Sequence, residues 1–189
     1  MGWVHSKSLN RGEPVKIEDL KNIIEALLFT TDKPLTSQRL QNITEHPSKD
    51  EIRSCINELR EDYSKRNGGI ELAEIAGGWQ FSTKFEYGKW VKKLFKSQTS
   101  YRLSKSSLET LAIVAYKQPI TRAEIENIRG VDSGGILRNL LEKRIIRITG
   151  KKSTIGHPLL YSTTQNFLRY FGLKDLSEMP SLKDFRQNQ

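Results

Sequence analysis

The side chains that could perform catalysis or bind a metal are few in this chain of 189 residues, and their spacing fits neither purpose. The three histidines, His5, His46 and His157, lie far apart, and none has a cysteine or carboxylate at the spacing of a metal site. The single cysteine, Cys55, falls on an apolar stripe with helical spacing. A small buried side chain explains this position better than a reactive thiol, because no basic neighbour is placed to activate it.

Motifs that bind nucleotides or activate a serine are also missing. The sequence contains neither GxxxxGKS/T nor GxGxxG, which cradle phosphates, and it lacks the GxSxG motif of serine hydrolases. Glu124 and Glu126 form a carboxylate pair on a short predicted helix, where a solvated surface is the usual interpretation. We therefore predict that the protein is not an enzyme and has no catalytic residue, no metal and no cofactor.

Positive charge is the remaining feature that could bind a ligand. The chain has 31 Lys and Arg against 22 Asp and Glu, a net charge of +9, which is compatible with nucleic acid, an acidic protein surface or simple solubility. In the second half, a basic cluster could bind phosphate groups, although a solvated hairpin tip explains it equally well. The cluster consists of Arg138, Arg144, Arg147, Lys151 and Lys152.

The elements that position these residues can be predicted from residues 103–161. An apolar face with helical spacing predicts a helix that ends before Pro119, because proline lacks an N–H and disfavours helix at the residue before it. Thr121 and Glu124 have the spacing of a capping box and predict a second helix, which Gly130 stops. A third helix, which Ser133 caps, and two alternating strands follow. This order is the winged form of the helix-turn-helix.

The first half repeats this order of elements. A helix begins at Ile17, and Pro34-Leu35-Thr36 stands where Pro119-Ile120-Thr121 stands in the second half. A third helix and a hairpin with a tight Gly77-Gly78 turn follow. We therefore predict an α+β, mainly α fold with two winged-helix domains in tandem. The predicted parts are a flexible tail (1–16), an N-terminal domain (17–98), a C-terminal domain (101–172) and a C-terminal arm (173–189) with a disordered end.

A further helix is predicted over residues 86–96, with one apolar stripe opposite several lysines. The stripe consists of Tyr87, Trp90, Val91, Leu94 and Phe95. A membrane-surface or anion-binding helix would have this pattern. We favour packing of the stripe on the first domain, because an equivalent helix follows the second hairpin. No apolar run approaches the ~18 residues that a membrane span needs, and the single cysteine fits a reducing compartment, so we expect a cytoplasmic protein without membrane partners.

The predicted recognition helices disfavour sequence-specific DNA binding. The start of the third helix normally carries the side chains that reach base edges. In the second domain this place holds Asp132, Ser133, Gly134 and Gly135, and in the first it holds Lys49, Asp50 and Glu51. Glycines read no bases and carboxylates repel phosphate, so only non-specific contact with DNA is expected.

The long block of residues 108–126 closely resembles segregation and condensation protein B, the bacterial ScpB family. The match continues through residues 128–131, Gly156-His157-Pro158 and residues 167–176, and in the first half through Ile24-Glu25-Ala26-Leu27-Leu28-Phe29. It covers about residues 17–182. The family often has Arg where His157 stands.

The resemblance implies a function that composition does not. Members of this family have two winged-helix domains and form homodimers, usually through the N-terminal domains. They bind the middle segment of a kleisin subunit, ScpA, which bridges the heads of an SMC ATPase in a complex that condenses and segregates the chromosome. We therefore expect a non-catalytic adaptor associated with the nucleoid. A winged-helix DNA-binding transcriptional regulator remains the alternative.

If the protein is an adaptor, we expect the kleisin groove on the second domain, because aromatic and arginine side chains commonly anchor such interfaces. The candidates are Tyr116, Pro119, Ile120, Arg122, Leu137 and Tyr161. For the dimer interface we expect the first helix, with Leu20, Ile24 and Phe29. Leu137, Tyr161 and the dimer candidates fit a hydrophobic core equally well.

Overall fold

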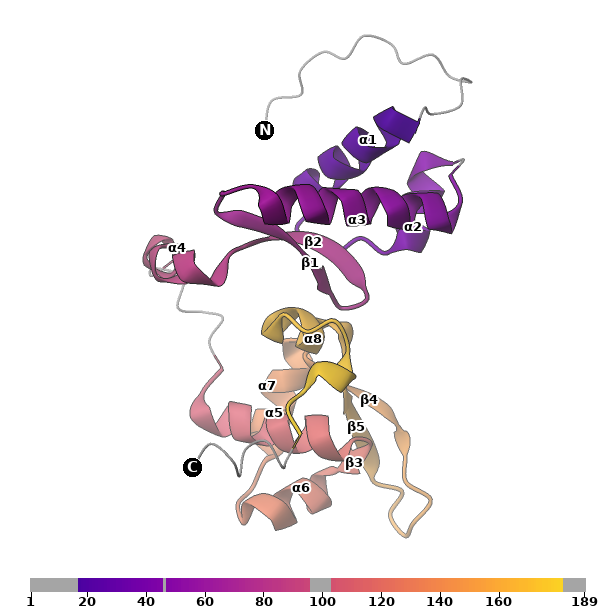
Figure 1. Cartoon of the computed structure of the whole chain (residues 1–189). Coiled ribbons are helices and arrows are strands. Elements are labelled where there is room, and N and C mark those ends of the chain that lie inside the picture. Colours follow the sequence, from indigo (N-terminus) through magenta and orange to yellow (C-terminus); the bar gives the residue numbers. More distant parts are fainter. Residues whose placement is uncertain (1–16, 46, 96–102, 182–189) are drawn as a thin grey trace. The chain divides into compact units, whose positions relative to one another are not determined.

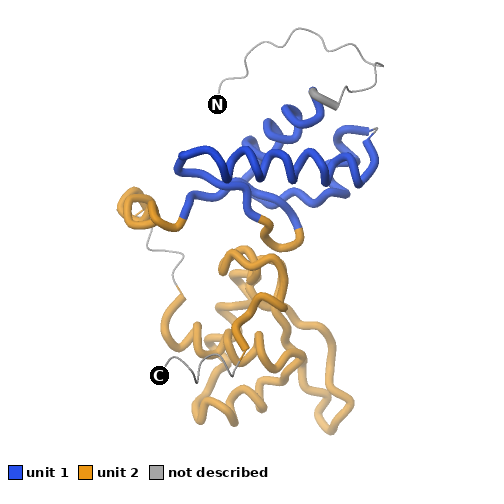
Figure 2. The backbone as a smooth tube through the Cα atoms, in the orientation of Figure 1, with its two compact units in different colours: residues 1–73, 78–84 blue, residues 74–77, 85–189 orange. Residues whose placement is uncertain are grey.

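The computed structural model describes residues 17–45, 47–95 and 103–181. The predicted tail, the end of the arm beyond Ser181, and His5 and His46 lie outside the described residues. The chain divides into two compact units (Figure 2), one with residues up to 73 and 78–84, the other with residues 74–77 and those from 85 onward. Both contain helices and a small antiparallel sheet (Figure 1), so the fold is a helix-rich mixture of α and β structure.

Residues 17–84 form helices followed by a tight hairpin, all in the first unit except residues 74–77 at the tip of the hairpin. The elements are α1 (Ile17–Thr30), α2 (Ser37–Thr44), α3 (Lys49–Lys65), β1 (Ile70–Ile75) and β2 (Gly78–Thr83). Ala76 and Gly77 form the turn with φ of 53° and 71°, the signs that a type I′ turn requires. Leu35, before α2, exchanges two backbone hydrogen bonds of 2.9 Å with Trp79. A Cβ at Gly78 would lie 2.9 Å from the Leu35 carbonyl carbon, so this close approach needs glycine.

One hydrophobic core holds this unit together. Its fully buried side chains come from all three helices: Ile24, Leu28, Leu40, Ile52 and Ile56. Cys55 is buried beside them, and burial raises the pKa of its thiol. The interpretation of Cys55 as a core residue is therefore confirmed. Ser48 and Glu51 form a capping box that fixes the start of α3.

The second unit has a three-stranded sheet and a longer hairpin. Its elements are η1 (Phe85–Tyr87), α4 (Gly88–Leu94), α5 (Lys105–Lys117), β3 (Ile120–Thr121), α6 (Arg122–Arg129), α7 (Gly134–Glu142), β4 (Ile146–Lys151), β5 (Leu159–Thr163), α8 (Gln165–Phe171) and η3 (Leu176–Glu178). The strands are antiparallel in the order β3-β5-β4, and Tyr161 of β5 pairs with Ile120 on one side and Ile148 on the other.

The local signals of the second half are confirmed with one exception. Thr121 and Glu124 form the predicted capping box of α6, and Gly130 ends this helix with a φ of 71°. Ser133 is the N-cap residue of α7, as predicted, but its side chain makes no capping hydrogen bond. Its hydroxyl instead accepts a hydrogen bond from Arg129 (2.9 Å), so it stabilises the turn between the two helices.

The apolar stripe on α4 is not packed into a core. Trp90 is 54% exposed and Leu94 76%, and no side chain of this helix is buried. The prediction that this stripe is packed on the first domain is therefore wrong for the described residues, where the stripe is exposed. No helix in the described parts of the chain is long and apolar enough to cross a membrane.

Candidate functional site

An apolar groove of about 330 Å³ runs along α5 in the second unit. Its walls come from α5, α8 and the segment after α8. The lining residues are Leu108, Leu111, Ala112, Ala115, Tyr116, Phe167, Phe171, Leu173, Met179 and Pro180. None of them carries a formal charge. The groove therefore suits apolar side chains of a ligand or partner.

The segment after α8 forms one wall of this groove, because its backbone is held by hydrogen bonds. The Tyr116 hydroxyl donates to the Pro180 carbonyl oxygen over 2.6 Å. Nearer α8, the Lys174 N–H donates to Glu178 (2.7 Å), and the Asp175 carboxylate caps η3 by accepting from the Ser177 N–H (2.7 Å). The part of the predicted C-terminal arm up to Ser181 is thus ordered against α5.

The rim of the groove exposes apolar side chains to water. Leu108 is 40% exposed and Phe171 45%. Phe171 also contacts the rings of Phe167 and Tyr170, with centroid distances of 5.0 and 5.1 Å, so its position is fixed by neighbours. Neighbouring exposed apolar side chains of this kind are typical of an interaction surface.

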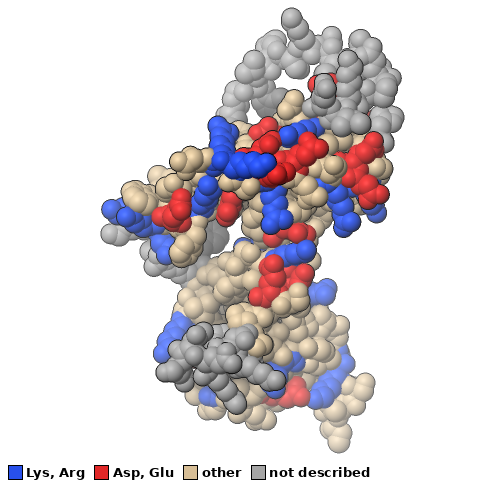
Figure 3. Space-filling model, viewed as in Figure 1, with Lys and Arg blue, Asp and Glu red and all other residues tan. Residues whose placement is uncertain are grey.

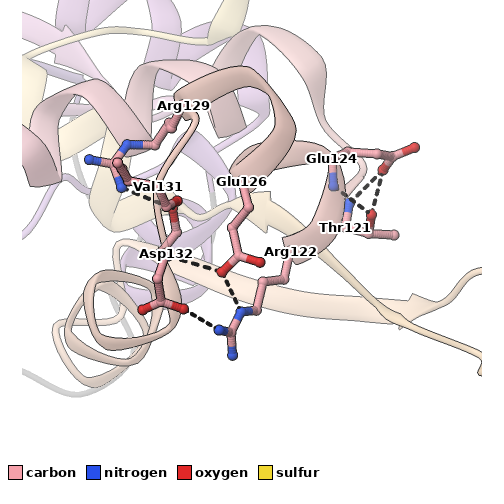
Figure 4. A network of polar contacts seen from close by, with 8 residues as sticks. Thr121, Arg122, Glu124, Glu126, Arg129, Val131 and Asp132 are labelled. Atoms are coloured by element: carbon pink, nitrogen blue, oxygen red, sulfur yellow. Dashed lines mark hydrogen bonds and ion pairs between the residues drawn. The ribbon is translucent and has the colours of Figure 1, made fainter.

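A second feature of this unit is a polar network between α6 and α7 (Figure 4). The Arg122 Nε donates to Glu126 Oε1 over 2.6 Å, and its guanidinium also bonds to Asp132. The same Glu126 oxygen accepts the Ser133 backbone N–H over 2.9 Å. The Ser133 N–H and the Arg122 guanidinium hold the pKa of Glu126 below its usual value. The network fixes the turn that leads into α7.

Gly134 gives the Arg122 guanidinium room at the start of α7. A Cβ on Gly134 would lie 2.7 Å from Arg122 Nη1. The place where a DNA-reading helix carries its base contacts is therefore occupied by a glycine and by an arginine that two carboxylates already neutralise.

Glu124 fastens α6 to the β4–β5 hairpin. Its Oε1 accepts a hydrogen bond of 2.6 Å from Lys152 Nζ, and its Oε2 accepts from the Thr121 N–H and hydroxyl. The Lys152 ammonium and then the two Thr121 donors lower the pKa of Glu124 to about 2. Glu124 is therefore ionised at neutral pH and neutralises the charge of Lys152.

The six kleisin-binding candidates separate into three groups. Ile120, Leu137 and Tyr161 are buried in the core of the second unit, and in this conformation their side chains present no surface to a partner. Pro119 and Arg122 are exposed but do not line the groove. Only Tyr116 lies in it.

Sequence reasoning missed the groove residues that come from α8 and the arm. Phe171, Met179 and Pro180 lie far from α5 in the sequence, and no local pattern joins them to it. One signal in the sequence could have indicated this contact. The arm contains apolar residues such as Leu173 and Met179, but it is too short to bury them by itself.

The three dimer-interface candidates have unequal exposure. Leu20 and Ile24 are buried in the core of the first unit, whereas Phe29 is 79% exposed. Phe29 alone of the three offers its side chain to a second copy.

The basic cluster also separates into two groups. Arg138, Arg144, Arg147 and Lys151 are exposed, and none of them belongs to an ion pair within the described residues. Lys152 is paired with Glu124. Arg144 and Arg147 together line a hollow of about 500 Å³. Among the described residues, no group of three or more His, Cys, Asp or Glu side chains is placed to hold a metal ion.

Comparison with known proteins gives consistent matches along the chain. The family model described as "Segregation and condensation complex subunit ScpB" matches residues 22–182. The segregation and condensation protein B of Syntrophotalea carbinolica is 45% identical over 170 residues, which are 89% of this chain and 85% of that protein. The protein of the same name from Desulforamulus reducens is 41% identical over 168 residues, 89% of this chain and 92% of that protein.

A solved structure of a dimer of the ScpB N-terminal domain complexed with ScpA peptide is also similar in sequence. It is 34% identical and covers 41% of this chain and 96% of that chain, with a TM-score of 0.38.

Proposed function

Because the chain belongs to the family of the segregation and condensation complex subunit ScpB, we propose that it is a non-catalytic adaptor that binds the kleisin subunit ScpA. Through ScpA it takes part in the SMC complex that condenses and segregates the chromosome. The protein acts as a homodimer in the cytoplasm, in association with the nucleoid. Family membership over residues 22–182 supports this assignment.

The apolar groove along α5 is the ScpA site in this proposal. The observation that carries it is an uncharged groove whose rim exposes Leu108 and Phe171 to water. When a partner buries exposed apolar surface of this kind, the removal of that surface from water favours binding by about 25 cal/mol per Å². Tyr116 supplies an aromatic anchor at one end, a residue type enriched at binding hot spots.

In this proposal residues 17–98 and 101–172 form two winged-helix domains. The observation that supports it is a short extended segment at the same place in each unit. Leu35 pairs with Trp79 before α2, and β3 pairs with β5 before α6. These segments follow α1 and α5, respectively, and join the hairpin, as the winged order of elements requires.

A non-catalytic role agrees with the chemistry of the groove. Its lining offers a single polar hydroxyl, that of Tyr116, and this hydroxyl is engaged by Pro180. General acid–base or nucleophilic catalysis needs a titratable or nucleophilic group within hydrogen-bond reach of the substrate. The start of α7 likewise gives the alternative, a sequence-reading regulator, no base-contacting side chain.

The test places a charge in the groove. Leu108→Glu is expected to weaken ScpA binding at least tenfold, or about 1.4 kcal/mol, because the carboxylate loses its hydration when the groove is filled. The matched control is Ile128→Glu, since Ile128 is an apolar side chain of the same unit, 54% exposed on α6 and outside the groove. Affinity is measured by isothermal titration with purified ScpA, and circular dichroism checks that both variants are folded.

Two results would count against the proposal in different ways. Equal affinities for the two variants would contradict the placement of the site in the groove. Failure of the unaltered protein to retain ScpA and SMC from native lysate, with nuclease present, would contradict the adaptor function itself.

A further inference from the structure

One stretch of the second unit has a large excess of positive charge. Residues 134–174 contain eight Lys and Arg and a single acidic residue, Glu142, a net charge of +7, whereas the whole chain has +9. This stretch includes α7, the β4–β5 hairpin and α8. Figure 3, by contrast, shows red and blue side chains interleaved over α1–α3. Such an excess of one sign attracts polyanions.

Within this stretch, two arginines converge on one hollow. Arg144 and Arg147 line a space of about 500 Å³ together with Thr164, Gln165 and Asn166, and no acidic side chain lines it. We call these five residues the arginine hollow. Neither arginine belongs to an ion pair found among the described residues, whereas Arg122 and Lys152 of the same unit are paired with carboxylates. The two guanidinium groups keep their full charge for a ligand.

The chemistry of the arginine hollow matches phosphate. A guanidinium presents donors in a fixed fork that fits phosphate oxygens, and side-chain amides such as those of Gln165 and Asn166 add neutral donors. These are the groups that contact the sugar–phosphate backbone of nucleic acids. The exposed Arg138 and Lys151, nearby in the sequence, add to the positive potential of this unit.

A double strand fits this surface better than a single strand. Single-stranded nucleic acids are held by exposed aromatic side chains on which bases stack. No aromatic residue lines the arginine hollow, and Tyr161, the tyrosine of the β4–β5 hairpin, is buried. The surface therefore offers charge and hydrogen-bond donors without a stacking platform.

We propose that the arginine hollow binds the phosphate backbone of duplex DNA without reading its sequence. The choice of DNA over duplex RNA rests on the proposed function, because the complex acts on the chromosome. Base reading is excluded by the start of α7, where Gly134 and the neutralised Arg122 leave no free side chain for base edges. The contact anchors the adaptor to the DNA on which its complex works.

The test measures the salt dependence of DNA binding by fluorescence anisotropy with a labelled duplex and the full-length protein. Each phosphate that the protein neutralises contributes about −0.9 to the slope of the logarithm of the association constant against the logarithm of the salt concentration. The two arginines should therefore give a slope of about −1.8 or steeper. Affinity should therefore fall at least about tenfold between ~50 and ~200 mM salt. Arg144→Ala with Arg147→Ala should remove about 1.8 from the slope and lower the affinity at ~50 mM salt by about 10²-fold.

The matched control is Arg39→Ala with Arg53→Ala, which removes two exposed arginines of the first unit and the same net charge. An equal loss of DNA affinity in both double variants would overturn the proposal, and so would a duplex affinity that does not depend on salt. Competition by duplex RNA or by polyglutamate as effective as that by DNA would also overturn it, in favour of RNA or of an acidic protein segment.

The same variants separate this inference from the proposed function. Arg144→Ala with Arg147→Ala should keep its affinity for ScpA, because neither arginine lines the groove along α5. Lost DNA binding with intact ScpA binding supports both proposals. Intact ScpA binding without any DNA binding by the unaltered protein overturns the DNA contact alone.

Discussion

Two segments of the chain, residues 17–84 and 103–181, repeat one order of elements but carry opposite charge. Residues 17–84 contain nine Lys and Arg against twelve Asp and Glu, a net charge of −3, whereas residues 103–181 contain twelve against seven, a net charge of +5. The overall charge of the chain hides this difference. Repetition of a fold therefore does not repeat a function, and binding surfaces have to be argued for each unit separately.

The two hairpins differ in how they are held. The first has a tight turn at Ala76 and Gly77, and backbone hydrogen bonds between Leu35 and Trp79 hold β2 next to this turn. The second has a long loop between Lys151 and Leu159 and is fastened to α6 by the Lys152–Glu124 ion pair. The first hairpin depends on backbone contacts and the second partly on side-chain charge, so substitutions and pH should affect the two differently.

The largest expected effects come from the cores, which should respond alike in the two units. Leu40→Ala in the first unit and Leu137→Ala in the second each remove a fully buried side chain, so each should lower the free energy of unfolding by about 2–5 kcal/mol. Urea titrations followed by circular dichroism would measure both values.

The Leu137→Ala variant also tests whether Leu137 belongs to the core or to the interface with ScpA. If Leu137 is a core residue, the folded fraction of Leu137→Ala should bind ScpA with unchanged affinity. A stable Leu137→Ala variant with weakened ScpA binding would instead return Leu137 to the interface, as the sequence had suggested.

Substitution of a glycine that another group approaches closely should destabilise the first unit more than the second. Gly78→Ala in the first hairpin brings a Cβ to 2.9 Å from the Leu35 backbone, which cannot move without breaking its pairing with Trp79. We expect a loss of about 1–3 kcal/mol, the range typical of overpacking. Gly134→Ala in the second unit meets the end of the Arg122 side chain, which can move away, so we expect a smaller loss. Thermal unfolding of the two variants measures this order, and the reverse order would contradict it.

Features predicted correctly from the sequence are those determined by neighbouring residues. The capping box of Thr121 and Glu124 and the end of α6 at Gly130 depend on backbone groups within one turn, so spacing alone reveals them. The arm in the groove was not predictable in this way, because Tyr116 and Pro180 are 64 residues apart. Such a contact depends on how the helices pack.

The same reason explains why the burial of the candidate site residues could not be predicted. An apolar residue next to a predicted turn can face the core or a partner, and periodicity does not distinguish the two, so Ile120 and Tyr161 were expected at an interface although they are buried. The five members of the predicted basic cluster looked equivalent in the sequence. Lys152 differs from the others because its partner Glu124 comes from α6, 28 residues earlier.

The smallest expected effect is a pH dependence that differs between two capping-box carboxylates. The pKa of Glu124 is lowered to about 2, first by Lys152 and then by Thr121, whereas that of Glu51 is lowered by Ser48 alone. A carboxylate with a lowered pKa in the folded state stabilises the fold fully above its unfolded pKa and loses this contribution as pH falls through the folded value. For Glu124 this window extends from about pH 4.5 down to about pH 2.

The melting temperature of the protein should therefore decrease across this window. Glu124→Gln should flatten the decrease more than Glu51→Gln, because only Glu124 also loses an ion pair to the hairpin. Melting curves at a series of pH values, read by circular dichroism, would show this difference. Equal flattening by the two variants would mean that the Lys152–Glu124 pair contributes nothing beyond the cap, and that the second hairpin, like the first, is held by its backbone alone.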